Sequence, residues 1–103
     1  MKSLKSQCYF NLAACHLQRE SWGGALHCCT QGLLLEPSSV KGLYRRSLAF
    51  SRLGRHTEAG EDAREGLVLE PHNKALGAQL QAATEALKVQ DVPLAQAMSK
   101  MFT

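Results

Sequence analysis

The sequence predicts an all-α protein that folds as a helix-turn-helix solenoid, because part of the chain repeats itself. Residues 32–37, Gly-Leu-Leu-Leu-Glu-Pro, return 34 positions later as residues 66–71, Gly-Leu-Val-Leu-Glu-Pro. Ala25 and Ala59 keep the same offset. A self-match at this period, with apolar residues at helical spacing, is typical of stacked helical repeats. Such arrays usually bind other molecules and seldom carry out chemistry.

Helix start and stop signals divide the chain into elements. Ser21, Ser38 or Ser39, Thr57 and Asn73 are predicted to cap the starts of helices. The helices predicted between these signals span about residues 4–19, 22–35, 40–53, 58–69 and 74–89, followed by a short one over 94–102.

Helix ends are predicted from proline and glycine. Pro37 and Pro71 should end the second and fourth helices, since proline disfavours helix in the residue before it. Gly54 suits the left-handed position after the third helix. Residues 90–93, Gln-Asp-Val-Pro, are expected to interrupt the pattern before the last helix.

Composition excludes several function classes. The net charge of +3 comes without a long basic run, which argues against nucleic acid as a partner. No apolar run approaches the roughly 18 residues that span a bilayer, so we expect a cytoplasmic protein with no membrane contact. The sequence contains no nucleophile motif, phosphate-binding loop or pair of acids that would indicate an enzyme or a cofactor.

The four cysteines, Cys8, Cys15, Cys28 and Cys29, form no C-x-x-C pair, so no metal site is expected. They are predicted to be reduced and mostly buried. Among them Cys15 and Cys29 are expected to pack in the core, and Cys28 to be more accessible.

The helix pairs resemble the tetratricopeptide repeat, on the strength of Ala25, Ala59 and the repeated Gly-Leu-x-Leu-Glu-Pro motif. The resemblance implies one repeat over residues 1–37, another over 38–71, a capping helix over 72–90 and a tail helix over 91–103. Two departures stand out. Arg46 lies where the family has leucine, and we expect it to be structural. Cys29 and Ala63 replace a large apolar residue.

Lys41 and Arg45 are four residues apart, so they share one helix face and could bind an anion. They could also be simply a solvated face. Residues 10–15 and 41–46 resemble the carboxylate-clamp repeats of chaperone-binding proteins, especially large immunophilins of the cyclophilin and FK506-binding types. The domain of these proteins has three repeats, and the resemblance implies that the two repeats of this chain correspond to the second and third. It implies clamp roles for Asn11, Lys41 and Arg45, with the remaining donors upstream. Distal peptide contacts are expected from Gln7, Gln18 and Arg52.

The resemblance therefore implies a co-chaperone module that binds the acidic C-terminal tail of a heat-shock chaperone. A prolyl isomerase domain would lie upstream in the parent protein. The alternative is a scaffold without tail binding, and the first helix pair, left open on one side, is expected to favour self-association. In the tail, Leu94, Met98, Met101 and Phe102 form an apolar stripe. With one lysine beside it, this stripe suits packing better than calmodulin binding.

Overall fold

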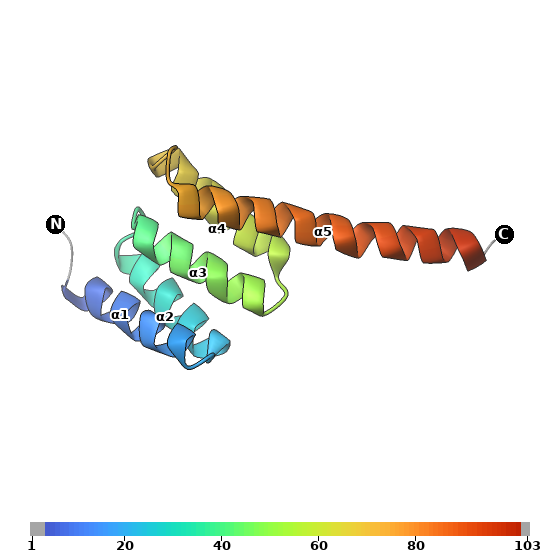
Figure 1. The fold of residues 1–103 in the computed structure, drawn as a ribbon. Coiled ribbons are helices and arrows are strands. Elements are labelled where there is room, and N and C mark those ends of the chain that lie inside the picture. Colours follow the sequence, from blue (N-terminus) through green and yellow to red (C-terminus); the bar gives the residue numbers. More distant parts are fainter. Residues whose placement is uncertain (1–3, 102–103) are drawn as a thin grey trace.

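Five helices form two layers in the computed structural model, which describes the backbone of residues 4–101 and the side chains of residues 4–88. The helices are α1 (Leu4–Gln18), α2 (Trp22–Leu35), α3 (Val40–Arg52), α4 (His56–Leu69) and α5 (Lys74–Met101). Each helix packs antiparallel on the next, and α3 also contacts α1 and α5 (Figure 1). The first helices of successive pairs, α1, α3 and α5, therefore form one layer, with α2 and α4 behind them. This is the predicted all-α solenoid, and none of these helices is long and apolar enough to cross a membrane.

Local hydrogen bonds explain most of the helix boundaries. The Ser39 hydroxyl accepts a bond from the Gly42 amide at 3.1 Å, and Asn73 Oδ1 accepts one from the Leu76 amide at 3.0 Å. Gly54 has a φ of 79°, which is the left-handed conformation predicted for it. Ser21 precedes α2 as predicted, but its side chain makes no capping bond.

The predicted cap at Thr57 is wrong, because α4 begins at His56, two residues before its predicted start at Glu58. The Arg55 amide donates to the Phe50 carbonyl at 2.8 Å, which closes the turn after α3. The Arg55 carbonyl then accepts from the Ala59 amide at 3.0 Å, so Arg55 is the capping residue. Thr57 consequently lies inside the first turn.

The predicted break at residues 90–93 is also wrong, because α5 is one helix of 28 residues. Pro93 removes a single amide donor, whereas the surrounding leucine, alanine, glutamine and lysine residues favour helix. The second half of α5 extends past the other helices (Figure 1). The apolar stripe predicted for the tail lies outside the described side chains.

The core consists mostly of small side chains and contains two phenylalanine rings, Phe10 and Phe50. Phe10 is 2% exposed and clusters with Leu33 and Leu43. A Cβ atom added at Gly32 would lie 2.4 Å from the Phe10 ring, and one added at Gly42 would lie 2.5 Å from it. The ring therefore occupies space that exists because α2 and α3 both carry glycine there.

Arg46 links the two helices of the second pair, α3 and α4, which agrees with the structural role predicted for it. Its Nε and Nη2 atoms each donate to one Asp62 carboxylate oxygen at 2.8 Å. The Asp62 side chain is 6% exposed and that of Arg46 is 23% exposed. The hydrogen bonds to Asp62 raise the pKa of Arg46, so the guanidinium stays charged. In the first repeat the equivalent positions, 34 residues earlier, hold Leu12 and Cys28.

The prediction of mostly buried thiols is only half correct. Cys28 and Cys29 are buried, but Cys8 and Cys15 are exposed. The predicted packing of Cys15 and the predicted accessibility of Cys28 are therefore both wrong, and only Cys29 packs as expected. The positions equivalent to Cys8 and Cys15 in α3 are Gly42 and Ala49, which are both buried. The α3 positions are covered because α2 packs on α3, whereas no described helix precedes α1 to cover its corresponding face.

Thiol labelling should separate the cysteines into two classes. Only the thiolate reacts, and burial raises the pKa of Cys28 and raises that of Cys29 to about 12. In the native protein at pH 7.5 we expect Cys8 and Cys15 to react first, Cys28 more slowly and Cys29 last. Mass spectrometry after timed quenching measures this order, and labelling in denaturant provides the control. Equal native rates for all four would contradict the packing of α2.

Candidate functional site

The layer of α1, α3 and α5 presents residues in columns, because the repeat places equivalent positions 34 residues apart. One column contains Gln7, Lys41 and Ala75, and the next contains Asn11, Arg45 and Gln79. Both columns belong to a single face, since their members are four residues apart on each helix. The predicted binding residues of the two repeats therefore lie on the same layer.

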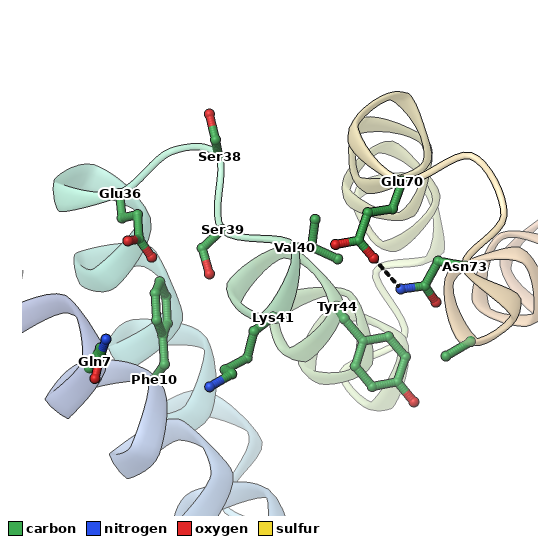
Figure 2. Close-up of a pocket in the computed structure, with 11 residues that line it drawn as sticks. Gln7, Phe10, Glu36, Ser38, Ser39, Val40, Lys41, Tyr44, Glu70 and Asn73 are labelled. Carbon is green, nitrogen blue, oxygen red and sulfur yellow. Dashed lines mark hydrogen bonds between the residues drawn. The ribbon is translucent and has the colours of Figure 1, made fainter. Parts of the chain in front are cut away.

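A pocket of about 560 Å³ opens between the starts of these three helices. Gln7 comes from α1, Lys41 and Tyr44 from α3, and Asn73 from the residue before α5. In Figure 2 Lys41 extends toward α1 and Tyr44 toward α5. The remaining lining residues are Phe10, Glu36, Ser38, Ser39, Val40, Glu70 and Ala75. Two of the predicted binding residues, Gln7 and Lys41, therefore line the same pocket.

Arg45 is held against α1 by a hydrogen bond. Its Nη1 donates to the Phe10 carbonyl at 2.7 Å. Phe10 precedes Asn11 in the chain, so this bond brings the guanidinium to the part of α1 that carries Asn11. Neither Arg45 nor Asn11 lines the pocket. Arg45 is half-buried and Asn11 is exposed.

Neither Lys41 nor Arg45 forms an ion pair with a described residue. Among residues 4–88 the ion pairs are Arg46 with Asp62 and Arg55 with Glu58. Lys41 is exposed and makes no hydrogen bond or ion pair with any described residue. Two positive charges close together and without acidic partners attract an anion.

The structure places the other predicted contacts elsewhere. Gln18 ends α1 and Arg52 ends α3, whereas the pocket lies at the starts of these helices. The Arg52 guanidinium lies over the Trp22 ring, 5.5 Å from its centroid. This cation–π contact gives Arg52 a packing role at the start of α2.

Several pocket residues were not predicted. Glu36 and Glu70 line it from equivalent turns, and Asn73 Nδ2 donates to Glu70 Oε1 at 3.1 Å (Figure 2). The repeated motif contains both glutamates, so the 34-residue period could have indicated them. The same period could have indicated Tyr44, because it is the repeat equivalent of Phe10, which also lines the pocket. The side chains described include no cluster of three or more metal-ligating residues.

Known proteins resemble this chain in both sequence and structure. No protein-family profile matches the chain. It is 38% identical over 92 residues to the human FK506-binding protein-like, covering 89% of this chain and 26% of that protein. It is 32% identical over 89 residues to the human peptidyl-prolyl cis-trans isomerase FKBP4, covering 86% of this chain and 19% of that protein. The chain thus spans about a quarter or less of the length of these relatives.

Solved structures share the fold. The Arabidopsis OM64 TPR domain matches with a TM-score of 0.76 and 33% identity, over 79% of this chain and 67% of that one. The myosin chaperone UNC-45 from C. elegans, in complex with a Hsp90 peptide, matches with a TM-score of 0.79 and 35% identity. That alignment covers 93% of this chain and 11% of UNC-45.

Proposed function

Because this chain belongs to the tetratricopeptide-repeat family and its relatives include FK506-binding proteins, we propose that it is the protein-interaction module of a co-chaperone. Its ligand is the acidic C-terminal tail of a heat-shock chaperone. The observation that carries the proposal is the pair Lys41 and Arg45, which lie on the α1–α3–α5 layer and form no ion pair with any described residue. The repeat fold binds and does not catalyse, so any isomerase activity of a parent protein belongs to another domain.

The proposed clamp holds the terminal carboxylates of the ligand between α1 and α3. Lys41 donates from its ammonium group, and Arg45 donates from the guanidinium N–H groups that Phe10 does not engage. Asn11 adds a neutral amide donor from the neighbouring helix. A C-terminal aspartate suits this set, because it offers two carboxylates close together.

UNC-45 supports the choice of ligand, since that protein is described in complex with a Hsp90 peptide. For this chain we infer only that its ligand belongs to the same chemical class of peptide. It places the protein in the cytoplasm, where it would meet such a chaperone. Asn11, Lys41 and Arg45 form a partial clamp, so we expect the isolated chain to bind weakly and added salt to weaken binding further.

Lys41→Ala should weaken binding of a synthetic acidic peptide ending in Glu-Glu-Val-Asp about tenfold or more. A hydrogen bond to a charged group contributes about 1.5–3 kcal/mol, and about 1.4 kcal/mol corresponds to a factor of ten. NMR titration of the chain measures such weak affinities. Lys74→Ala is the matched control, because Lys74 is an exposed lysine that does not line the pocket. The same peptide with an amidated C-terminus should not bind.

The alternative is a scaffold that uses its faces for oligomerisation without binding a tail. It is favoured by α1, where Leu4 is 82% exposed and Leu12 is 51% exposed on the face that also carries Cys8 and Cys15. Such a face could pack on a helix from a second copy. If Lys41→Ala leaves the peptide affinity unchanged, the clamp is wrong and the scaffold takes its place.

A further inference from the structure

The pocket beside Lys41 consists of two halves that the repeat relates to each other. One half lies at α1 and the turn after α2, and the other lies at α3 and the turn after α4. The offset of 34 residues pairs Gln7 with Lys41, Glu36 with Glu70, and Ser39 with Asn73. Each half therefore contributes one glutamate, and Figure 2 shows these glutamates on either side of the start of α3.

Both glutamates keep their charge available to a ligand. Glu36 is half-buried and Glu70 is exposed, and neither forms an ion pair with a described residue. Asn73 Nδ2 donates to Glu70 Oε1 at 3.1 Å, but this amide is neutral and leaves the charge uncancelled. The residues that line the pocket therefore bring two carboxylates and, from Lys41, one ammonium group.

Binding of a ligand at the clamp changes this balance of charge. The proposed clamp uses Lys41 for a terminal carboxylate, which leaves Glu36 and Glu70 as the unopposed charges among the lining residues. An acidic side chain that entered the pocket would then face two like charges at short range, where salt screens them little. A side chain with a hydrogen-bond donor would instead meet carboxylate oxygens that accept.

We propose that Glu36 and Glu70 are specificity-determining residues, which favour an uncharged, hydrogen-bond-donating side chain near the clamped end of the ligand over an acidic one. This inference rests on the proposed function, because it takes Lys41 as a clamp residue. Among tails that end in aspartate, the chain therefore prefers those that carry glutamine-like residues in the pocket to those that carry glutamate there.

The ligand residues concerned are the third and fourth from its C-terminus. The clamp lies between α1 and α3, whereas the pocket continues past Lys41 to Asn73 and Ala75 at the start of α5. Neighbouring packed helices are about 8–10 Å apart, and an extended peptide advances about 3.3 Å per residue. A peptide held at Lys41 therefore reaches the second half of the pocket about three residues before its end.

Two octapeptides that differ only in charge test this assignment, one ending in Glu-Glu-Val-Asp and the other in Gln-Gln-Val-Asp. NMR titration at low salt gives the ratio of their affinities. Glu36→Gln and Glu70→Gln should each shift this ratio about 2- to 5-fold toward the glutamate peptide, the effect of one partly exposed charge pair. Glutamine keeps the oxygen that accepts from Asn73. Glu61→Gln is the matched control, because Glu61 is exposed on α4 and does not line the pocket.

The control separates a local effect from a change in net charge, since all three variants lose one negative charge. Glu61→Gln should leave the ratio unchanged. If Glu36→Gln and Glu70→Gln also leave it unchanged, or shift it no more than Glu61→Gln does, the specificity assignment is wrong. The clamp stands in that case provided that Lys41→Ala weakens both peptides. No binding of either peptide to the unsubstituted chain would overturn both proposals.

Discussion

Replacing Arg46 by leucine is expected to lower the free energy of unfolding by about 3 kcal/mol or more. The substitution leaves the Asp62 carboxylate, whose side chain is 6% exposed, without its two charge-assisted hydrogen bonds. Removing one partner of a buried ion pair costs about 3–5 kcal/mol, because the remaining charge stays desolvated. The partial exposure of Arg46 places the effect near the lower figure. Urea denaturation followed by circular dichroism measures it.

The first repeat supplies the control for this experiment. At the positions of Arg46 and Asp62 it carries Leu12 and Cys28, which are both uncharged. The double variant Arg46→Leu/Asp62→Cys should therefore recover most of the lost stability, since an apolar pair can replace a buried ion pair at little cost. A double variant as unstable as Arg46→Leu would show that the loss comes from packing of the arginine stem.

Phe10→Ala should lower the free energy of unfolding by about 3–5 kcal/mol, as is usual when a buried aromatic ring is removed. The ring is 2% exposed and lies where α1, α2 and α3 meet. The helical backbone of α2 and α3 lies against the ring at Gly32 and Gly42, so the cavity cannot close easily. Chemical denaturation measures the loss, and the folded baseline of the variant shows whether the helices survive.

Glycine variants check how closely the ring is enclosed. Gly32→Ala places a methyl group against Phe10, so it should cost about 1–3 kcal/mol through overpacking. Gly23→Ala, in the same helix, meets no atom within 4 Å and should stabilise the protein by about 0.5–1 kcal/mol through helix propensity. Equal effects of the two variants would contradict the contact between Phe10 and Gly32.

The fold was largely predictable, because the repeat period and the helix-ending residues act locally. The second helix matches its predicted bounds of 22–35, and Ser39, Gly54 and Asn73 play their predicted parts. The failures have local causes that a pattern does not reveal. Arg55 replaces Thr57 as a cap because its backbone is already bound to Phe50. Pro93 did not end α5 because one lost hydrogen bond was outweighed by its helix-forming neighbours.

The candidate site was less predictable than the fold. Periodicity indicates which face a residue occupies, and it placed Lys41 and Gln7 together correctly. It cannot show which groups satisfy one another across helices. The bond from Arg45 to Phe10 and the stacking of Arg52 on Trp22 both depend on side-chain reach. The burial of each thiol likewise depends on whether a neighbouring helix covers it.

The bond between Arg45 and the Phe10 carbonyl makes the two cations of the proposed clamp thermodynamically different. Arg45 is already ordered in the unliganded protein, so ligand binding restricts its side chain little further. Lys41 has no such anchor and would lose up to about 2 kcal/mol of rotamer freedom on binding. Two contacts of equal strength would then contribute unequally to affinity. In the proposed complex, preorganisation would thus make the guanidinium the more effective of the two donors, and restricting the lysine side chain would be the most direct way to tighten binding.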